Sequence, residues 1–331
     1  WSSGVSSSDL DGILPTLLRP VGCLVAGIAA LRQTRSAPYR AAVPVICVGN
    51  LVAGGAGKTP VTLDIVARLN ARNIAVHVLM RGYGGSEIGP LRVIPEIHSA
   101  AEVGDEALLL AATAPTWVSR DRVAGAKAAI EAGAEALVLD DGFQNPTLHK
   151  DLSILVVDGC YGFGNGRVIP AGPLRETVEV GLKRAHAVVL MGPDEADVWG
   201  RVQRAGFKHL PILRARLEAT PDAQDLKDRK VYAFAGIGRP QKFFNTLSGL
   251  GCKLVGCKGF DDHHPYQDAE IDALLKDAAS ATLVTTTKDH VRLSARHRSQ
   301  VRAVAVKLAW KDSPTMDALL DTVFEGNVAH G

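Results

Sequence analysis

Five short apolar runs mark the first two thirds of the chain. Each is a continuous stretch rich in Val, Ile and Leu, which is typical of a strand buried on both faces of its sheet. Segments with helical periodicity lie between them, such as residues 60–71, where Pro60 suits a first helical turn. Strands that alternate with helices predict a parallel α/β sheet. The predicted strands are "VPVICVGN" (43–50), "IAVHVLM" (74–80), "ALVLDDG" (136–142), "LSILVVDG" (152–159) and "AHAVVLMG" (185–192).

A second series of the same kind begins near Lys230. Its apolar runs alternate with helical patterns at residues 240–250 and 266–279. The polar stretch 218–230 between the two series is the best candidate for a linker. We therefore expect two α/β domains with a boundary near residue 220. The strands predicted in the second series are "KVYAFAGI" (230–237), "KLVGCKGF" (253–260), "ATLVTTTKD" (281–289) and "RAVAVKLAW" (302–310).

The stretch 13–31 near the start of the chain is strongly apolar. Its length barely reaches the roughly 20 residues that a membrane-spanning helix needs, and Arg19 lies inside it. Asp9 and Asp11 precede it, where a signal peptide carries positive charge. An interfacial helix, a buried core helix and a true span therefore remain open. The interfacial alternative has a basic flank in Arg32, Arg35 and Arg40.

Length and composition set further limits. The 331 residues exceed one typical domain, and a content of 47% hydrophobic and 22% charged residues is ordinary for a soluble globular protein. A net charge of +2 gives no indication of nucleic acid as a partner. The five cysteines are scattered and include no CxxC pair, which favours free thiols in a reducing cytosol.

The segment "GNLVAGGAGKTP" after the first predicted strand is typical of a phosphate-binding loop. It ends in Gly-Lys-Thr, as the pattern G-x-x-x-x-G-K-[ST] requires, although Val52 takes the place of the first glycine. In such a loop backbone N–H groups point at phosphate oxygens, Lys58 reaches the outer phosphates and Thr59 offers a hydroxyl to Mg²⁺. We therefore expect nucleotide binding by Gly54, Gly55, Ala56, Gly57, Lys58, Thr59 and Pro60.

A phosphate loop needs acidic groups for its metal, and two places provide them. Asp140 and Asp141 stand at the end of a predicted strand, in the Walker-B position, although acids before a glycine are also common in plain turns. Asp105 and Glu106 begin a helical pattern, where they could equally cap the helix and complement its dipole.

Four further motifs carry polar side chains. "RGYGG" (81–85) follows a strand at the carboxyl edge of the sheet, where ligands of open α/β sheets bind. The basic residues of "SRDRVAGAKAA" (119–129) suit either a ligand or a solvated helix face. "GFDDHHPY" (259–266) suits a base facing a cleft better than a metal site, with a surface turn as the alternative. In "TTTKDH" (285–290) the Asp directly follows the Lys, which argues against the guanine-reading motif of GTPases.

Together these motifs resemble the tetraacyldisaccharide 4'-kinase family of the lipid A pathway. "VPVICVGNLVAGGAGKTP", "RGYGG", "GDEALLLA", "SRDRVAGAKAA", "DDGFQ", "GRVIPAGPLRE", "FDDHHPY" and "LVTTTKD" occur in that family's order between about Val43 and Asp289. Single motifs of this kind are weak, but eight in order are specific. The resemblance implies an enzyme that moves the γ-phosphate of ATP to the 4'-hydroxyl of a tetraacyldisaccharide 1-phosphate.

The resemblance also implies roles for particular residues. Asp105 is the expected base, aided by His263, with ATP and Mg²⁺ as cofactors. The residues expected around the metal are Thr59, Glu106, Asp140 and Asp141. The candidates for gripping the sugar and its 1-phosphate are Arg81, Tyr83, Arg120 and Gln144, with Arg167 and Arg175 as substitutes. The expected fold is a P-loop NTPase-like parallel sheet domain (38–220) with a smaller C-terminal α/β domain (225–331) and an N-terminal membrane-associating helix (9–37).

A glycolipid substrate bears on the expected location. Each CH₂ buried in a bilayer is worth about 0.8 kcal/mol, so the enzyme must come to the membrane surface. We therefore expect a peripheral or monotopic protein on the cytoplasmic face of the inner membrane, with no nucleic-acid partner. The alternative is a membrane-associated partition-type P-loop ATPase switch, which would leave the second domain and its Asp-His loop without a role.

Overall fold

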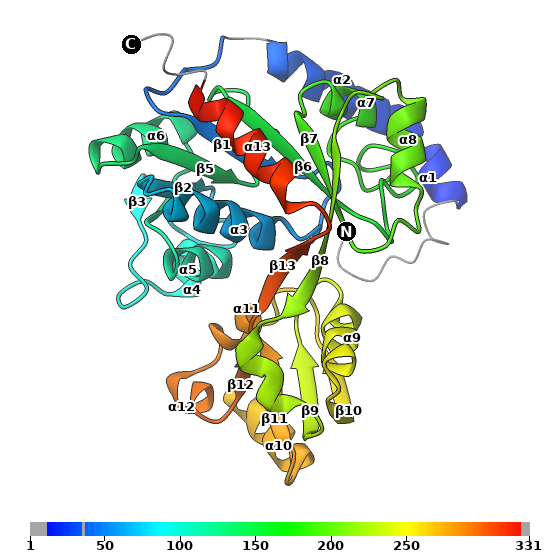
Figure 1. Cartoon of the computed structure of the whole chain (residues 1–331). Coiled ribbons are helices and arrows are strands. Elements are labelled where there is room, and N and C mark those ends of the chain that lie inside the picture. Colours follow the sequence, from blue (N-terminus) through cyan, green and yellow to red (C-terminus); the bar gives the residue numbers. More distant parts are fainter. Residues whose placement is uncertain (1–11, 35–36, 326–331) are drawn as a thin grey trace.

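The computed structural model describes residues 12–34 and 37–325, which form two α/β lobes (Figure 1). The large lobe contains a nine-stranded sheet and comprises the described residues up to 219 together with 306–325. The small lobe, residues 220–305, contains a four-stranded sheet. An antiparallel pair of strands, β8 (Ile212–Ala219) and β13 (Val306–Trp310), leads from one lobe to the other.

The large sheet has the strand order β13-β8-β7-β6-β1-β5-β2-β4-β3. It is parallel except at its edges, where β13 pairs antiparallel with β8 and β3 with β4. All five strands predicted in the first series form. The chain places later strands on both sides of β1, so the loop after β1 lies at the kind of switch point where open α/β sheets bind ligands. The remaining strands are β1 (Val45–Gly49), β2 (Val76–Met80), β3 (Leu91–Arg92), β4 (Thr116–Val118), β5 (Ala136–Asp140), β6 (Leu152–Asp158) and β7 (Ala187–Met191).

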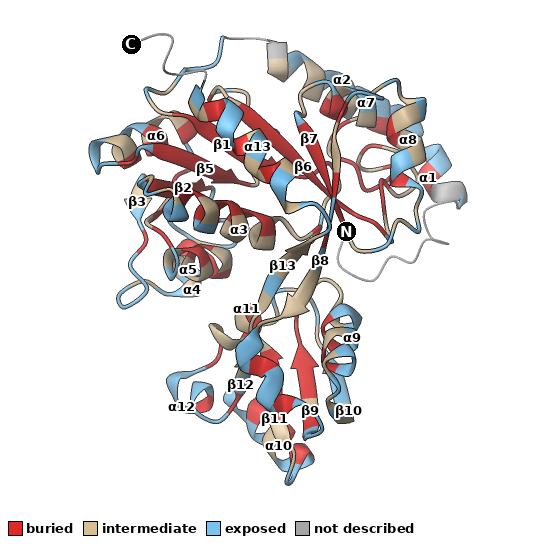
Figure 2. Ribbon diagram, viewed as in Figure 1, coloured by how far each residue is buried: buried red, intermediate tan, exposed pale blue. Residues whose placement is uncertain are grey.

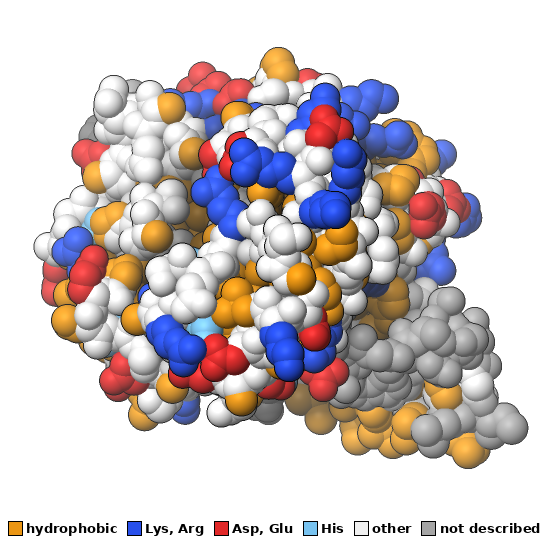
Figure 3. Space-filling model, turned by 90° about the horizontal axis from the view of Figure 1, so that it is seen from below, with side chains coloured by type: hydrophobic (Ala, Val, Ile, Leu, Met, Phe, Trp, Pro, Cys, Tyr) orange, Lys and Arg blue, Asp and Glu red, His pale blue; other side chains and the backbone are white. Residues whose placement is uncertain are grey.

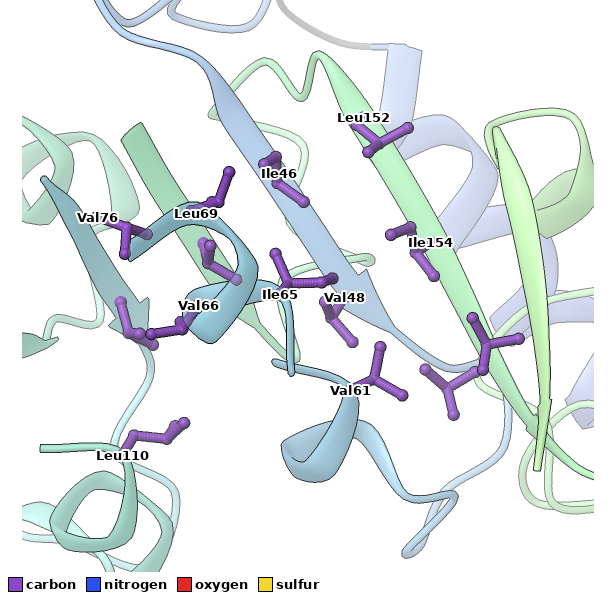
Figure 4. Close-up of a cluster of buried hydrophobic side chains, with 14 of the residues drawn as sticks. Ile46, Val48, Val61, Ile65, Val66, Leu69, Val76, Leu110, Leu152 and Ile154 are labelled. Atoms are coloured by element: carbon purple, nitrogen blue, oxygen red, sulfur yellow. The ribbon is translucent and has the colours of Figure 1, made fainter. Parts of the chain in front are cut away.

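Two hydrophobic cores lie on opposite faces of this sheet, because successive side chains of a strand alternate between faces. Ile46 and Val48 of β1 belong to one core, with Ile65 of α3 (Figure 4), and Val45 and Cys47 belong to the other. Figure 2 shows buried residues along the strands and exposed ones on the outer helix faces. The helices here are α3 (Lys58–Ala71), α4 (Ala100–Val103), α5 (Asp105–Ala111), α6 (Arg122–Glu131), α7 (Val178–Leu182), α8 (Val198–Arg204) and α13 (Ser313–Glu325).

The small lobe has the strand order β10-β9-β11-β12, with every pair parallel. The expected linker 218–230 is compact, because the 3₁₀ helix η2 (Pro221–Leu226) buries Ala223 and Leu226 in this lobe's core. The strands are β9 (Lys230–Ala235), β10 (Lys253–Gly259), β11 (Thr282–Thr286) and β12 (Arg302–Val304). The helices are α9 (Pro240–Leu250), α10 (Asp268–Ala278), α11 (Thr287–His290) and α12 (Ala295–Arg298).

The end of the chain differs from the expected domain 225–331. The run 302–310, predicted as one strand, is split: β12 pairs with β11, whereas β13 crosses to the large sheet and pairs with β8. The following helix α13 packs on α3 and the large sheet through the buried side chains of Met316, Leu320 and Val323. Segment 306–325 therefore belongs to the large lobe. An apolar run indicates that a strand forms, but it does not indicate which sheet the strand joins.

Two helices, α1 (Ile13–Leu17) and α2 (Arg19–Thr34), form within the expected N-terminal element, of which residues 9–11, 35 and 36 lie outside the described part. Among the helices that the structure describes, none combines the length and the apolarity of a membrane span. Gly22 is the only residue of α2 with a described burial that is buried, so the core-helix alternative is wrong. A Cβ at Gly22 would lie 2.8 Å from the Val168 carbonyl oxygen, which places α2 directly on the large lobe.

We predict that Leu320→Ala lowers the free energy of unfolding by about 2–5 kcal/mol, because it opens a cavity in the core shared by α13 and α3. Chemical unfolding measures the loss, and hydrogen exchange of α3 amides tests where it acts. The control is Thr322→Ala on the exposed side of α13, which stays within about 0.5 kcal/mol of wild type. Unchanged exchange in α3 would contradict the assignment of α13 to the large lobe.

Candidate active site

The loop between β1 and α3 has the backbone of a phosphate-binding loop. Gly54 and Gly57 have φ values of 125° and 91°, a left-handed conformation that glycine adopts without strain. Helix α3 begins at Lys58, and its N-cap Gly57 provides no side-chain cap. The first N–H groups of α3 are therefore available to an anion, and the helix dipole favours negative charge there.

The departure at Val52 has a structural reason. Val52 forms an antiparallel bridge with Leu174, and on either side of it the Ala53 N–H donates to the Pro173 oxygen (2.8 Å) and the Arg175 N–H to the Leu51 oxygen (2.8 Å). The first half of the loop is thus extended like a short strand. An extended position accepts valine, so no glycine is needed there. The motif "GRVIPAGPLRE" is the segment that supports the loop.

Asn50, which the sequence motifs did not single out, shapes the loop from inside. Its buried side-chain amide donates to the Val52 oxygen at 2.6 Å and to the Gly54 oxygen at 3.1 Å. Its Oδ1 accepts a hydrogen bond of 3.3 Å from Lys58 Nζ. The sequence feature that could have identified Asn50 is its position: it is a polar residue directly after a buried strand and before the glycines.

The neighbouring acids Asp140 and Asp141 have different surroundings. Thr59 Oγ1 donates to Asp140 Oδ2 at 3.3 Å, whereas the buried Asp140 Oδ1 has no hydrogen-bond partner. Burial, together with the charge of Glu106, raises the pKa of Asp140 to about 7. Burial also disfavours the charged form of Asp141, but Lys58 and Arg175 outweigh it and lower the pKa of Asp141. Arg175 binds Asp141 through two nitrogens, at 2.8 and 3.2 Å.

Asp105 lies at the start of α5 and is held by two residues of the small lobe. Arg292 Nε is 3.0 Å from Asp105 Oδ2, with a second contact from Nη2, and His263 Nδ1 is 3.3 Å from the same oxygen. Burial raises the pKa of Asp105, but the bond with His263 and the charges of Lys288 and Arg292 outweigh burial, so the pKa lies well below its usual range. The expected pair of Asp105 and His263 is therefore brought together across the lobes.

Lys288 and Arg292 are cations that the motifs did not assign to the site. Lys288 Nζ lies 3.4 Å from Glu106 Oε1, 3.4 Å from His263 Nε2 and 3.8 Å from Asp262 Oδ1. Arg292 also binds the fully buried Asp289 at 3.0 Å. Both follow β11 in the stretch "TTTKDHVR". From its residue spacing we concluded only that this stretch is not a guanine-binding motif. Their contacts with α5 depend on how the lobes meet.

The candidates for substrate binding occupy different places. Arg81, Tyr83 and Arg120 are exposed, Tyr83 to 79%. Gln144 is next to the phosphate loop, because its amide donates to the Asn50 oxygen at 2.9 Å and to Glu176 Oε1 at 3.1 Å. Of the two substitutes, Arg175 lies at the loop beside Asp141, whereas Arg167 contacts Thr16 of α1 at 3.3 Å.

These features define a class of protein. A glycine loop at a helix N-terminus, a lysine and a threonine on that helix, and a buried carboxylate at the end of the neighbouring strand β5 form a P-loop nucleotide site. The small lobe adds a histidine and two cations above it. The fold and site are those of a two-lobed P-loop enzyme for phosphoryl transfer.

Comparisons with known proteins identify the family. The family described as tetraacyldisaccharide-1-P 4'-kinase, LpxK, matches residues 14–325. The tetraacyldisaccharide 4'-kinase of Rhodospirillum centenum is 56% identical over 326 residues, with 96% of this chain and 94% of that protein covered. The one of Rhodospirillum rubrum is 50% identical over 320 residues, with 96% and 97% covered. The chain belongs to the tetraacyldisaccharide-1-P 4'-kinase family.

A solved structure agrees with this family. LpxK from Aquifex aeolicus, crystallised in complex with ATP, is similar with a TM-score of 0.77 and 30% identity, covering 94% of this chain and all of that one. The family confirms the expected function, transfer of the γ-phosphate of ATP to the 4'-hydroxyl of a tetraacyldisaccharide 1-phosphate in lipid A biosynthesis. Membership of this family also excludes the alternative prediction, a partition-type ATPase switch.

We predict that Arg292→Met lowers the free energy of unfolding by about 3–5 kcal/mol, because it removes the cation shared by two buried carboxylates. Urea unfolding measures the difference. Arg216→Met is the matched control: Arg216 pairs with Glu218 in an exposed contact, and its loss changes stability by about 0–1 kcal/mol. Equal effects of the two substitutions would show that the Arg292 contacts are energetically no different from a surface pair.

Proposed function

We propose that the contact between Asp105 and His263 is the proton-accepting centre of the kinase. The acceptor hydroxyl attacks the γ-phosphorus: the sugar O–P bond forms, the bond from phosphorus to the β–γ bridging oxygen breaks, and ADP leaves with that electron pair. The hydroxyl proton goes to the Asp105–His263 pair. The observation that carries the proposal is the 3.3 Å contact between the two side chains, which joins the lobe with the phosphate loop to the small lobe.

The arrangement of the pair suggests how it divides the work. Asp105 Oδ2 and Arg292 Nη2 both lie 3.3 Å from His263 Nδ1. In the proposed arrangement Nδ1 carries a proton that it donates to Asp105, which leaves the lone pair of Nε2 as the outer acceptor. A carboxylate whose pKa is held low by two cations is a weak proton acceptor by itself. The resemblance implies Asp105 as the base aided by His263; we propose that Asp105 orients the ring and that the proton enters through Nε2.

We also propose where Mg²⁺ binds. Asp140 Oδ1 is a buried oxygen without a hydrogen-bond partner, and Thr59 Oγ1 and Glu106 lie beside the same carboxylate. Hard oxygen donors of this kind suit Mg²⁺, which would neutralise charge on the phosphates. In the described residues no cluster of three or more His, Cys, Asp or Glu could hold a metal alone. In this proposal phosphate oxygens of ATP complete the coordination of Mg²⁺.

The remaining polar residues of the loop have supporting roles in this proposal. Asp141 is bound by Arg175 and lies 3.7 Å from Lys58, so we assign it to orienting Lys58 rather than to the metal. Lys58 and the N–H groups of residues 54–60 bind the phosphates of ATP. The proposed contacts for the sugar and its 1-phosphate are still Arg81, Tyr83, Arg120 and Gln144. Gln144 has the strongest support, because it lies beside Asn50.

We predict that Asp105→Ala lowers the kinase rate by about 10²–10⁴, the usual share of acid–base catalysis, while ADP still binds. The rate is the formation of glycolipid that has gained one phosphate, followed by mass spectrometry. The control Asp158→Ala also removes a large-lobe carboxylate that pairs with small-lobe cations, Arg239 at 3.1 Å and Lys242. An unchanged rate in Asp105→Ala, or an equal loss in Asp158→Ala, would remove Asp105 from the mechanism.

The N-terminal helices support a proposed membrane contact. An apolar row follows one side of α1 and α2, on the side away from Gly22, and its residues are exposed by 46–70%. The row is Leu17, Val21, Leu24, Ile28 and Leu31, at the spacing of one helix face. Figure 3 shows hydrophobic side chains gathered at the edge of the molecule where Figure 1 places α1. We propose that this row lies in the membrane interface, where an acylated substrate is held.

The basic flank contributes less to this proposal than the sequence suggests. Arg40 is exposed but pairs with Asp151 at 3.1 Å, and Arg35 and the Arg32 side chain lie outside the described part. We propose a peripheral or monotopic location on the cytoplasmic face of the inner membrane, carried by the apolar row.

We predict that Leu24→Glu together with Ile28→Glu weakens binding to phosphatidylethanolamine–phosphatidylglycerol vesicles at least about tenfold. Burial of one such side chain contributes about 1.5–3 kcal/mol, and tenfold corresponds to about 1.4 kcal/mol. Vesicle flotation measures the binding. The control Val255→Glu charges an equally exposed residue of β10 in the small lobe, 53% exposed, and leaves binding unchanged. Unaltered flotation of the double variant would exclude the apolar row as the membrane contact.

A further inference from the structure

The mechanism above gives no role to Lys288, although its ammonium contacts both Glu106 and His263. Lys288 belongs to α11, a single turn that follows β11 directly. The Asp289 N–H donates to the Thr286 hydroxyl at 3.0 Å, and buried Asp289 accepts from the Gly236 N–H at 3.1 Å and the Tyr266 hydroxyl at 3.0 Å. The base of α11 is therefore firmly anchored in the small lobe, and the long Lys288 side chain extends from it toward the large lobe.

The ammonium of Lys288 is shared among partners at long distances. Its contacts with Glu106, His263 and Asp262 measure 3.4, 3.4 and 3.8 Å, whereas a strong charge-assisted hydrogen bond measures about 2.7–2.9 Å. The side chain is also 21% exposed, against 7% for Arg292. Arg292 is thus a fixed cation, and Lys288 is a loosely held one that can change partners.

The partners of Lys288 lie at the two ends of the reaction. Glu106 is close enough to Asp140 to raise its pKa, and Asp140 contacts Thr59 at the phosphate loop. His263 belongs to the proposed proton-accepting pair. The Lys288 ammonium therefore has the phosphate donor on one side and the proton acceptor on the other. The phosphoryl group is transferred through the space between them. Phosphoryl transfer depends on positive charge placed around this group.

We propose that Lys288 is a cation that the small lobe supplies to the transferred phosphoryl group. When ATP occupies the loop, the ammonium exchanges Glu106 and Asp262 for oxygens of the γ-phosphate. It stays with these oxygens while the O–P bond to the sugar forms and the bond to the leaving ADP breaks. A lysine suits this exchange, because its compact charge sits on a flexible stem with three donors.

The same exchange frees the proton acceptor. In the structure Lys288 Nζ is 3.4 Å from His263 Nε2, so it occupies the lone pair that would take the hydroxyl proton. Movement of the ammonium to the phosphate leaves Nε2 open to the sugar hydroxyl. Binding of the donor and readiness of the acceptor are thereby coupled through one side chain. This inference rests on the proposed roles of Asp105, His263 and the phosphate loop.

The test compares Lys288→Ala and Lys288→Arg with Lys242→Ala in the full chain. Lys242 is the matched control, a small-lobe lysine that pairs with the large-lobe carboxylate of Asp158 and has no described contact with Glu106, Asp262 or His263. Kinase assays with the glycolipid give kcat, and titration gives ADP affinity. Thermal shift with ADP, and with ADP plus aluminium fluoride as a mimic of the transferred phosphoryl group, gives a readout that a merely structural role would not change.

We expect Lys288→Ala to lose at least about 10³ in kcat, the effect of removing a cation that stabilises the transferred phosphoryl group. ADP affinity and the ADP thermal shift stay near wild type, and the additional shift from aluminium fluoride disappears. Lys288→Arg recovers part of kcat and of that additional shift, and Lys242→Ala keeps both.

Three results would overturn the inference: unchanged kcat in Lys288→Ala, an equal loss in Lys242→Ala, or a retained aluminium fluoride shift. With an active wild type, these results leave the proposed roles of Asp105 and the loop intact. A wild-type protein that forms no phosphorylated glycolipid would overturn the proposed function itself, and the inference with it.

Discussion

The ion pairs that join the two lobes in the described part of the chain all have the same polarity. The large lobe contributes the carboxylates Asp105, Glu106 and Asp158, and the small lobe contributes the cations Arg239, Lys242, Lys288 and Arg292. The carboxylate side of the interface belongs to the lobe that contains the phosphate-binding loop. In the proposed mechanism Lys288 of the small lobe neutralises charge on the donor without the reorganisation that water would require. The contacts at Asp105 and Glu106 that join the two lobes are therefore also the contacts that assemble the proposed proton-accepting site.

The phosphate loop depends on segments that are distant in sequence. Residues 173–175 pair with residues 51–53, and Arg175 of the same segment binds Asp141 after β5. Gln144 connects the Asn50 carbonyl to Glu176, and its own carbonyl accepts from Gln33 of α2 at 3.0 Å. The N-terminal helix is thus only one residue away from the loop. This places the proposed membrane contact and the phosphate site on one continuous framework.

Much of the fold could be read from local pattern. Continuous apolar runs bounded by Gly and Asp predict buried parallel strands, and β1, β5, β6 and β7 form where these runs lie. The run 302–310 exposes the limit of this reasoning, because two sheets compete for it and only pairing with β8 decides that Val306–Trp310 leaves the small lobe. The helix 313–325 follows that strand, so its domain could not be predicted either.

Local patterns along the chain predict the parallel sheet, the phosphate loop and the carboxylates, since glycine conformation, apolar runs and strand-end acids act over a few residues. The sequence also placed Asp105 and His263 as a pair, through resemblance to a family. Contacts between distant segments were needed to show that Val52 is a strand position, that Asp140 rather than Asp141 keeps an oxygen unpaired, and that Lys288 and Arg292 face α5. These contacts depend on how sheets and lobes pack against each other. Burial and long-range charge determine them, and neither produces a periodic pattern in the sequence.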